Sequence, residues 1–264
     1  MSSNGNSPFA IVTGASSGIG YQLAKLCAQW GYDLLLAADS PSIGDVAAEL
    51  RTYGGSVHAL EVDLATPSGL ERLWAAAKGR PIDALLANAG HGLGGGFLDQ
   101  EFADARHVLD TNVTGTLYLL HEVGRRMRLR RSGRILITGS SAGFAPGAGQ
   151  TVYNATKAFI DSFAQALRAE LAESGVTVTC LLPEATETGF FERAGLLDTE
   201  LGQAPKADPA DVARLGFEAM LCGEGDVVVG REYKLEVAFA NVLPAEVLAE
   251  RHKKLAEPGS AAQK

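Results

Sequence analysis

Cysteine is scarce in this 264-residue sequence, and its three cysteines, Cys27, Cys180 and Cys222, lie far apart in apolar segments. An odd, scattered set argues against a disulfide framework and gives no ligand spacing for a metal, so we expect a reducing compartment and no metal site. The sequence also lacks any run near the roughly 18 apolar residues of a membrane span. Its polar start, Met1 to Pro8, has no secretory core. These absences predict a cytoplasmic protein without a membrane partner.

Positive charge is in deficit: 23 Lys and Arg face 31 Asp and Glu, for a net charge of −8. Such a surface repels nucleic acid and anionic lipid, so we expect neither as a partner. Apolar residues make up 46% of the chain, enough for one sizeable core. We expect a disordered N-terminus over 1–7, a single domain over 8–256 and a frayed C-terminus over 257–264.

Short apolar runs alternate with longer amphipathic segments along the whole chain. This alternation is typical of repeated βα units around a parallel sheet. The predicted fold class is α/β, a doubly wound Rossmann fold with a seven-stranded parallel sheet and helices on both faces. Strands are expected at 9–13, 33–38, 57–62, 84–87, 134–138, 176–182 and 227–229. Helices are expected near 19–30, 42–53, 68–78, 102–130, 151–173 and 209–222, with Ser68 and Asp208 as N-caps.

A glycine-rich turn joins the first expected strand to the first expected helix. Such a turn presents backbone N–H groups and the helix dipole to the pyrophosphate of a dinucleotide. A glycine turn can also simply connect a strand to a helix, but its position here favours a cofactor site. The residues expected to bind the cofactor are Gly14, Ser16, Ser17, Gly18, Ile19 and Gly20.

Asp39 ends the second expected strand, 19 residues beyond Gly20. An acid at this point fits the ribose hydroxyls of NAD and repels the 2′-phosphate of NADP. Neither Ser17 nor Ser40 supplies the cation that a phosphate would need. We therefore expect NAD(H) to be favoured, with NADP(H) possible. The alternative is that Asp39 only caps a turn or the following helix, which would leave the preference open.

Tyr153 and Lys157 are four residues apart in an expected helix, so their side chains share one face. An ammonium group near a phenol lowers the phenol pKa, which would let Tyr153 exchange a proton with a carbonyl or alcohol oxygen. A tyrosine and a lysine at this spacing are more often surface residues. Their context decides between the two interpretations.

That context is a set of motifs in a fixed order: Thr13 to Gly20, Asn88-Ala89-Gly90, Asn112, Ser140, and Tyr153-Asn154-Ala155-Thr156-Lys157. Together they resemble the short-chain dehydrogenase/reductase family in its compact single-domain form, over roughly residues 8–230. The resemblance implies an oxidoreductase that uses NAD or NADP to interconvert an alcohol and a ketone or aldehyde. It also implies a homodimer or homotetramer paired through the helices near 102–130 and 151–173.

The resemblance assigns a role to each catalytic position. Ser140 would bind the substrate oxygen, with Ser141 as the second candidate. Tyr153 would act as acid and base, and Lys157 would tune it while holding the nicotinamide ribose. Asn112 would support a water-linked proton relay through Lys157, although a buried asparagine satisfied by backbone is the alternative reading.

The resemblance also extends the cofactor site. Asn88, Ala89 and Gly90 would line the adenosine-ribose region and stabilise the sheet. Asp63 would fix the adenine amino group with the Leu64 backbone beside it, unless Asp63 is a plain turn residue. Pro183, Thr186 and Thr188 would lie at the nicotinamide, the two threonines holding its carboxamide.

Glu184 departs from the family pattern, which has glycine after this proline. If the backbone there needs a glycine-like conformation, Glu184 is strained by about 1 kcal/mol or more. Otherwise its carboxylate reaches the rim of the active site.

The substrate side is expected around a mobile lid over 189–206. Phe190, Phe191, Leu196 and Leu197 make this lid apolar, which favours an apolar or aromatic small molecule, although they could also be helix core. His91 is expected to be a loop residue, and the tail beyond Arg231 to cover the pocket or a subunit contact. Two other functions stay open: a non-redox lyase or epimerase on the same scaffold, and a catalytically silent nucleotide-binding protein.

Overall fold

The computed structural model describes residues 7–230 and 243–263, and its centre is a seven-stranded sheet. All neighbouring strands are parallel, in the order β3-β2-β1-β4-β5-β6-β7. The predicted fold class is confirmed, and the strand ends differ from expectation by one residue at most. The strands are β1 Phe9–Thr13, β2 Asp33–Ala38, β3 Val57–Glu61, β4 Ala84–Ala87, β5 Gly133–Thr138, β6 Val176–Leu182 and β7 Asp226–Val228.

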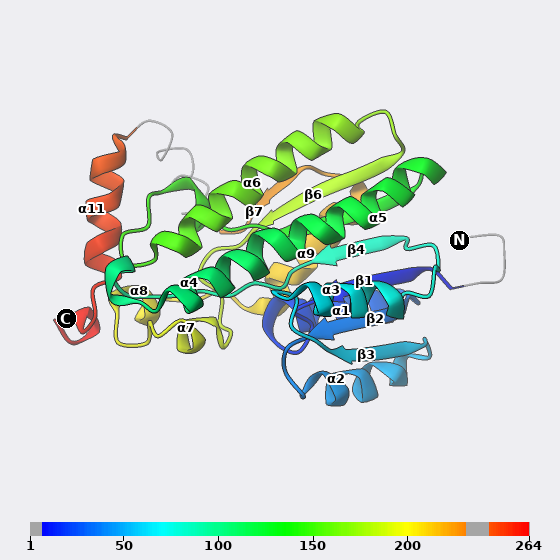
Figure 1. Ribbon diagram of the computed structural model, residues 1–264, viewed down its shortest axis with the longest axis horizontal. Coiled ribbons are helices and arrows are strands. Elements are labelled where there is room, and N and C mark those ends of the chain that lie inside the picture. Colours follow the sequence, from blue (N-terminus) through cyan, green and yellow to red (C-terminus); the bar gives the residue numbers. More distant parts are fainter. Residues whose placement is uncertain (1–6, 231–242, 264) are drawn as a thin grey trace.

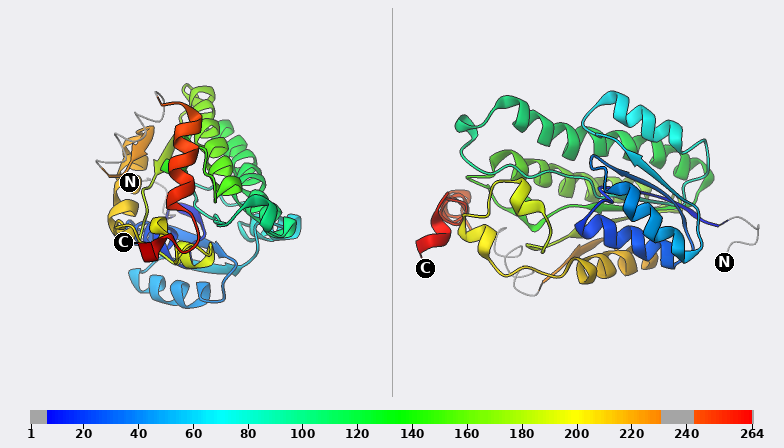
Figure 2. Two further views of the ribbon diagram at one scale, coloured as in Figure 1. Left: turned by 90° about the vertical axis from the view of Figure 1, so that its left-hand side faces the viewer. Right: turned by 90° about the horizontal axis from the view of Figure 1, so that it is seen from below.

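Helices cover both faces of the sheet (Figure 2). One face carries α1 Gly18–Gln29, α2 Ile43–Leu50 with the 3₁₀ turn Arg51–Tyr53, and α9 Pro209–Cys222. The other carries α3 Pro67–Ala76, α5 Thr116–Arg130 and α6 Thr151–Leu171. Because both faces are buried, the inner strands are nearly continuous apolar runs, as in Phe9–Thr13.

The N-caps of two helices show how local sequence sets the helix starts. Asp208 directly precedes Pro209 and accepts a hydrogen bond from the Ala210 N–H, so it caps α9 as predicted. The prediction of Ser68 as the cap of α3 was wrong. Thr66 accepts from the Gly69 N–H instead, and Pro67 then occupies the first helical position.

The long helix expected over 102–130 is broken into three parts. After the 3₁₀ turn Phe97–Asp99, α4 spans Phe102–Leu109, a π-helical segment spans Asp110–Gly115, and α5 follows. At Gly115 a Cβ atom would lie 2.6 Å from the Leu64 carbonyl oxygen, so the helix packs against the β3–α3 connection here. Such π segments often occur at functional sites, because the extra residue re-aims the side chains around it.

Short helices gather beyond the carboxyl ends of the strands (Figure 1). They are α7 Phe190–Arg193, α8 Glu200–Gln203 and α11 Ala245–Leu255, followed by the 3₁₀ turn Ser260–Gln263. Fraying was expected for 257–264, but over 257–263 the chain is tied down: Ser260 Oγ accepts from the Glu200 N–H and Asp198 Oδ2 from the Gly259 N–H. None of the helices in the described ranges combines the length and apolarity that crossing a membrane requires.

Candidate active site

The predicted site residues meet at the carboxyl edge of the sheet. The chain turns in opposite directions after β1 and β4, which are neighbours, and such a switch point leaves a crevice. A cavity of about 880 Å³ occupies this crevice. It is lined by most of the predicted residues: Gly14, Ser16, Ser17, Gly18, Ile19, Asp39, Asp63, Leu64, Asn88, Ala89, Gly90, Ser140, Tyr153, Lys157, Pro183, Thr186 and Thr188. Gly20 and Asn112 lie behind this wall.

The glycine turn is shaped so that α1 points its N-terminus into the cavity. Gly14 has a φ of +64°, a left-handed conformation that glycine adopts without strain. A Cβ at Gly20 would collide with the Gly14 carbonyl oxygen. Ser17 occupies the N-cap position of α1 without a side-chain cap bond. The turn therefore leaves backbone N–H groups at the helix start facing the cavity.

Asp39 and His91 meet across the cavity wall, a contact that the sequence did not indicate. His91 Nε2 lies 3.1 Å from Asp39 Oδ2. The hydrogen bond from His91 lowers the pKa of Asp39, and the Arg193 charge adds to that effect. The His91 ring also lies 4.9 Å from the His107 ring. His91, expected to be a plain loop residue, is thus a partner of the predicted ribose-binding acid.

Asn88 and its neighbours fasten β4 to the glycine turn. Asn88 Nδ2 donates to the Thr13 carbonyl, and Thr13 Oγ1 accepts from the N–H groups of both Asn88 and Ala89. Thr138, the last residue of β5, donates from its Oγ1 to Asn88 Oδ1. These bonds hold three strand ends together, which agrees with the stabilising role expected for this motif.

Asp63 is engaged in its own turn. Its Oδ1 accepts from the Ala65 N–H at 2.8 Å, and its carbonyl accepts from Thr66 Oγ1. Asp63 is therefore a turn residue, as the alternative interpretation held. It also lines the cavity, so its binding of the adenine amino group stays a proposal.

Asn112 lies in the π-helical segment, and its side chain is fully bonded. Its Oδ1 accepts from the His91 N–H, and its Nδ2 donates to the His91 carbonyl and to Thr156 Oγ1. Asn112 thus joins the loop after β4 to α6. These bonds fit the alternative interpretation, in which Asn112 is a buried polar residue satisfied largely by backbone groups. The proton relay stays a proposal.

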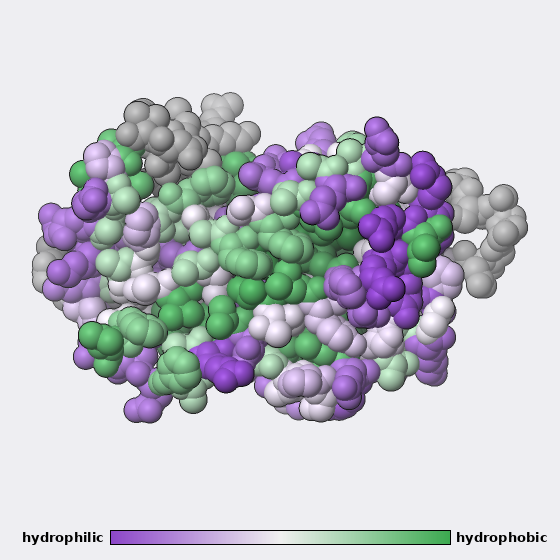
Figure 3. Space-filling view, turned by 45° about the horizontal axis from the view of Figure 1, so that its top comes forward, coloured by the Kyte–Doolittle hydropathy of each residue, from purple (hydrophilic) through white to green (hydrophobic). Residues whose placement is uncertain are grey.

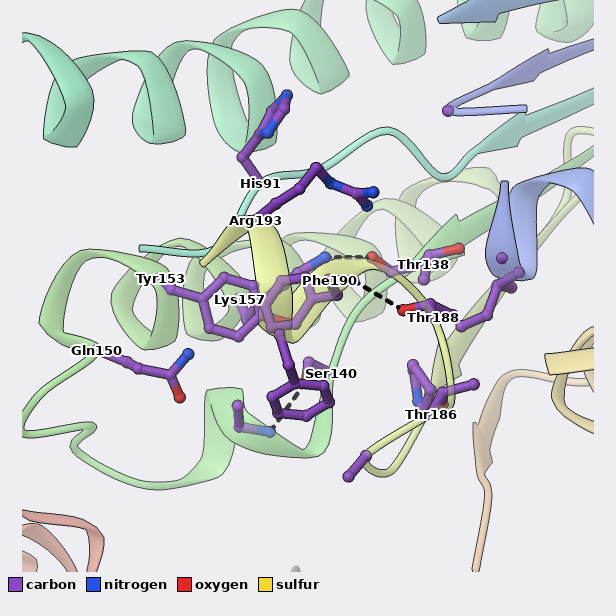
Figure 4. A pocket seen from close by; sticks show the side chains of 18 of the residues that line it. His91, Thr138, Ser140, Gln150, Tyr153, Lys157, Thr186, Thr188, Phe190 and Arg193 are labelled. Atoms are coloured by element: carbon purple, nitrogen blue, oxygen red, sulfur yellow. Dashed lines mark hydrogen bonds between the residues drawn. The ribbon is translucent and has the colours of Figure 1, made fainter. Parts of the chain in front are cut away.

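Tyr153 and Lys157 share the face of α6 that borders the cavity (Figure 4). Lys157 is buried and its Nζ donates to the Thr138 carbonyl at 2.8 Å, 5.9 Å from the Tyr153 ring centroid. The sequence predicted a lowered phenol pKa. Instead, burial raises the pKa of Tyr153 to about 12, although the hydrogen bond with Ser140 opposes the rise. In this arrangement the ammonium is directed at the backbone rather than at the phenol.

Asp161 is a buried acid that the sequence reading missed. It lies one turn beyond Lys157 on α6, and its Oδ1 accepts from the Ser140 N–H at 3.2 Å. Burial raises its pKa to about 7, against the opposing effect of Lys157. A single carboxylate in the apolar stretch Ala158-Phe159-Ile160-Asp161 was the available signal.

The segment after β6 bonds its threonines to its own backbone, so their carboxamide role stays a prediction, and it answers the question at Glu184. Thr186 Oγ1 donates to the Glu184 carbonyl, and Thr188 Oγ1 accepts from the Phe190 N–H. Among the described residues, only Lys78 and Arg131 combine a side chain with a positive φ. Glu184 is therefore unstrained, and it lines the cavity, as the second alternative required.

The segment expected to form the lid, residues 189–206, packs against the glycine loop after β4 and reaches Tyr153. Phe191, Ala194 and Leu196 form a small apolar cluster of their own. A Cβ at Gly92 or Gly94 would collide with Phe190 or approach Leu196, so these glycines make room for the lid. The Phe190 ring lies 5.0 Å from the Tyr153 ring.

The C-terminal helix α11 closes another side of the cavity. His252 Nδ1 lies 2.9 Å from the Ala148 carbonyl, and Leu248 and Leu255 line the cavity. The part of the tail over 231–242 lies outside the described residues.

Comparison with known proteins places this site in a family. The protein-family model for short chain dehydrogenases matches residues 8–196 of this chain. An uncharacterized oxidoreductase of Myxococcus xanthus is 32% identical over 243 residues, covering 89% of this chain and 92% of that protein. The chain belongs to the short-chain dehydrogenase/reductase family of oxidoreductases, as its motifs indicated.

Two solved structures are similar in fold and in sequence. A short-chain dehydrogenase from Sphingobium yanoikuyae in complex with NADPH superposes with a TM-score of 0.80 at 31% identity, over 89% of this chain and 93% of that one. The bulky-bulky ketone specific alcohol dehydrogenase from Comamonas testosteroni gives a TM-score of 0.76 at 28% identity, over 89% and 92%.

Proposed function

We propose that this protein is an NAD(P)-dependent oxidoreductase that interconverts an alcohol and a ketone or aldehyde, with Tyr153 as the acid and base. The observation that carries the proposal is that one cavity is lined both by the glycine turn with Asp39 and by Ser140, Tyr153 and Lys157. Cofactor-binding and proton-transfer groups therefore face the same space.

The residues present fit a nicotinamide dinucleotide. The start of α1 offers backbone N–H groups, and the glycines of the turn leave room that side chains would fill. In this proposal Asp39 would bind one ribose and Lys157 the other, and Pro183, Thr186 and Thr188, which line the same cavity, would hold the nicotinamide. When bound, the nicotinamide supplies or accepts the hydride.

Tyr153 and Ser140 perform the proton chemistry at the substrate oxygen. Ser140 donates a hydrogen bond to that oxygen and stabilises the charge that develops on it. Tyr153 gives its proton to the oxygen in reduction and takes one in oxidation. In this proposal Lys157 would hold the nicotinamide ribose, and its charge, 5.9 Å from the Tyr153 ring centroid, would favour the phenolate that forms during turnover.

NAD(H) is the favoured cofactor in this proposal. Asp39 is an acid with a lowered pKa, so it is ionised at neutral pH and repels a 2′-phosphate. Arg193 lines the same cavity and offers a cation, so NADP(H) is retained as a substrate of lower preference.

The substrate is proposed to be an apolar or aromatic small molecule. Its side of the cavity carries Phe144 from the loop after β5, Phe190 and Leu201 from the lid region, and Leu248 and Leu255 from α11. The name of the Comamonas enzyme, which specifies bulky ketones, supports a large apolar substrate.

The test is a panel of aliphatic, aromatic and polycyclic ketones, with their alcohols, assayed with NADH or NADPH through the absorbance of the reduced nicotinamide. We expect turnover of at least one bulky apolar ketone, faster with NADH. Conversion of substrate without net change in nicotinamide absorbance would instead indicate a lyase or epimerase.

A further inference from the structure

Asp161 lies beneath the proposed catalytic residues, in a column on one face of α6. Tyr153, Lys157 and Asp161 follow one another at four-residue spacing, so each side chain lies one turn above the next. Asp161 is 5% exposed. A buried carboxyl group is rare without a partner or a role, because burial penalises its ionised form.

One oxygen of Asp161 holds the backbone of the serine loop. Oδ1 accepts from the Ser140 N–H at 3.2 Å, and the Cys180 thiol approaches the same oxygen at 3.9 Å. The other oxygen, Oδ2, is buried without a hydrogen-bond partner. The carboxyl is therefore held by a hydrogen bond at Oδ1, on the Ser140 side, and lacks one at Oδ2.

The serine loop is shaped around this carboxyl group. A Cβ at Gly139 would collide with Asp161 Oδ1, and a Cβ at Gly143 would collide with Oδ2. Gly139 directly precedes Ser140, and Gly143 lies within the 3₁₀ turn Ser141–Phe144 that forms a wall of the cavity. The loop reaches its position only because the carboxyl fits between its two glycines.

We propose that Asp161 is a positioning residue of the active site: it fixes the Ser140 backbone and, through its charge, sets the balance between Tyr153 and Lys157. The inference rests on the proposed function for the roles of these three residues. Asp161 touches none of the reacting atoms and acts through its neighbours.

The charge effect acts on both neighbours on α6. Burial lowers the pKa of Lys157, and the Asp161 carboxylate raises it, so an ionised Asp161 favours the ammonium form. The same carboxylate raises the pKa of Tyr153. Because the Asp161 pKa is about 7, this influence changes as the pH passes through neutrality.

Besides Tyr153 and Lys157 on α6, the titratable groups that face Asp161 come from β6 and β7. Burial raises the pKa of the Cys180 thiol, so the thiol stays neutral. Asp226 raises the Asp161 pKa from β7, but it is paired with Arg168. Lys157 and Tyr153 complete the set. Among these groups Asp161 is the one with a pKa near 7, so the proposal assigns the expected step to it.

The experiment compares Asp161→Asn, Asp161→Leu and the exposed α6 control Glu170→Gln. Asparagine keeps an acceptor for the Ser140 N–H but carries no charge. We expect kcat of Asp161→Asn to lose the inflection near pH 7 that wild type and Glu170→Gln show, with KM for NADH unchanged. Leucine also removes the acceptor, so kcat should fall by about 10- to 100-fold at every pH, which asparagine rescues.

A second readout does not depend on turnover. In infrared spectra of the complete protein, we expect the carbonyl band of a protonated carboxylic acid in wild type, lost as pH rises through about 7. The band should be absent from Asp161→Asn. A wild-type inflection that persists in Asp161→Asn would overturn the inference. So would a band in the difference spectrum of wild type minus Asp161→Asn that titrates near pH 4, as for an ordinary carboxyl. Failure of wild type to convert any ketone would instead count against the proposed function, and the infrared result would still stand.

Discussion

His91 Nε2 lies 3.1 Å from Asp39 Oδ2, so the acid at the end of β2 is held by a residue from the loop after β4. One carboxylate oxygen is engaged and the group is oriented before a nucleotide arrives. If Asp39 binds the ribose as proposed, we expect cofactor choice to depend on this pair of residues and not on Asp39 alone.

Replacing His91 by alanine should weaken NADH binding by about 3- to 10-fold, because a hydrogen bond to a charged group is lost and Asp39 is no longer oriented. Fluorescence titration of NADH measures the affinity, and kcat at saturating NADH should change little. The matched control is His107→Ala, which removes the ring beside His91 and keeps the His91–Asp39 contact. Equal affinities in wild type and His91→Ala would contradict the expectation.

The double change Asp39→Ala with Ser40→Arg should shift preference from NADH to NADPH. It removes the charge that repels a 2′-phosphate and adds a guanidinium that can bind one. The ratio of kcat/KM for the two cofactors measures the shift, and Asp39→Ala alone separates the two contributions. An unchanged ratio would remove Asp39 from its proposed role.

Tyr153→Phe should lower kcat by about 10²- to 10⁴-fold, since the variant keeps the ring and loses the proton donor. NADH affinity should stay close to wild type. Tyr118→Phe on α5, outside the cavity lining, is the matched control and should keep full activity. Activity retained in Tyr153→Phe would show that another group exchanges the proton.

The stability of the protein should depend on the ionisation of Asp161. Its pKa rises from the ordinary value of 3.8 to about 7 on folding, so the folded state binds a proton more tightly than the unfolded state. The contribution of this group to the free energy of unfolding is fully present below about pH 4 and is lost as pH rises through 7. Asp161→Asn cannot ionise, so its melting temperature relative to wild type should increase from pH 4 to pH 8. A difference that is constant with pH would refute this.

The face carrying α5 and α6 shows a hydrophobic band (Figure 3). Phe102, Leu109 and Phe159 on α4 and α6 are all more than 40% exposed, and the Phe159 ring stacks on Phe163 at 6.0 Å. We expect the protein to be a homodimer or homotetramer through this face. Analytical ultracentrifugation should show that Phe159→Glu dissociates it, whereas Leu129→Glu, an equally apolar position at the far end of α5, does not.

The sequence could predict the sheet because strands buried on both faces are continuous apolar runs, as at Phe9–Thr13. It could also gather most of the cavity, because the glycine turn, Asp39, Asp63, Asn88 and Ser140 each follow a strand and Tyr153 and Lys157 share one face of α6. It could not predict the π segment around Asn112, since one extra residue barely alters the apolar period of a helix. Four-residue helices such as α7 are too short to carry a period at all.

Contacts between distant segments were the other gap. The His91–Asp39 pair joins residues 52 positions apart, and no local pattern indicates it. The phenol pKa was predicted with the wrong sign, because spacing on α6 says which side chains are neighbours but not that Lys157 points to the Thr138 carbonyl. Burial, which depends on the whole fold, then decides the direction.

The burial of Cys180 makes the catalytic core accessible to measurement. Its thiol is enclosed between β6 and Asp161 on α6, whereas Cys222 at the end of α9 is exposed. A thiol reagent should therefore label Cys222 at once and reach Cys180 only when α6 separates from the sheet. In a Cys27→Ala variant, which lacks the other buried thiol, the rate of the slow labelling phase would report these openings without any substrate.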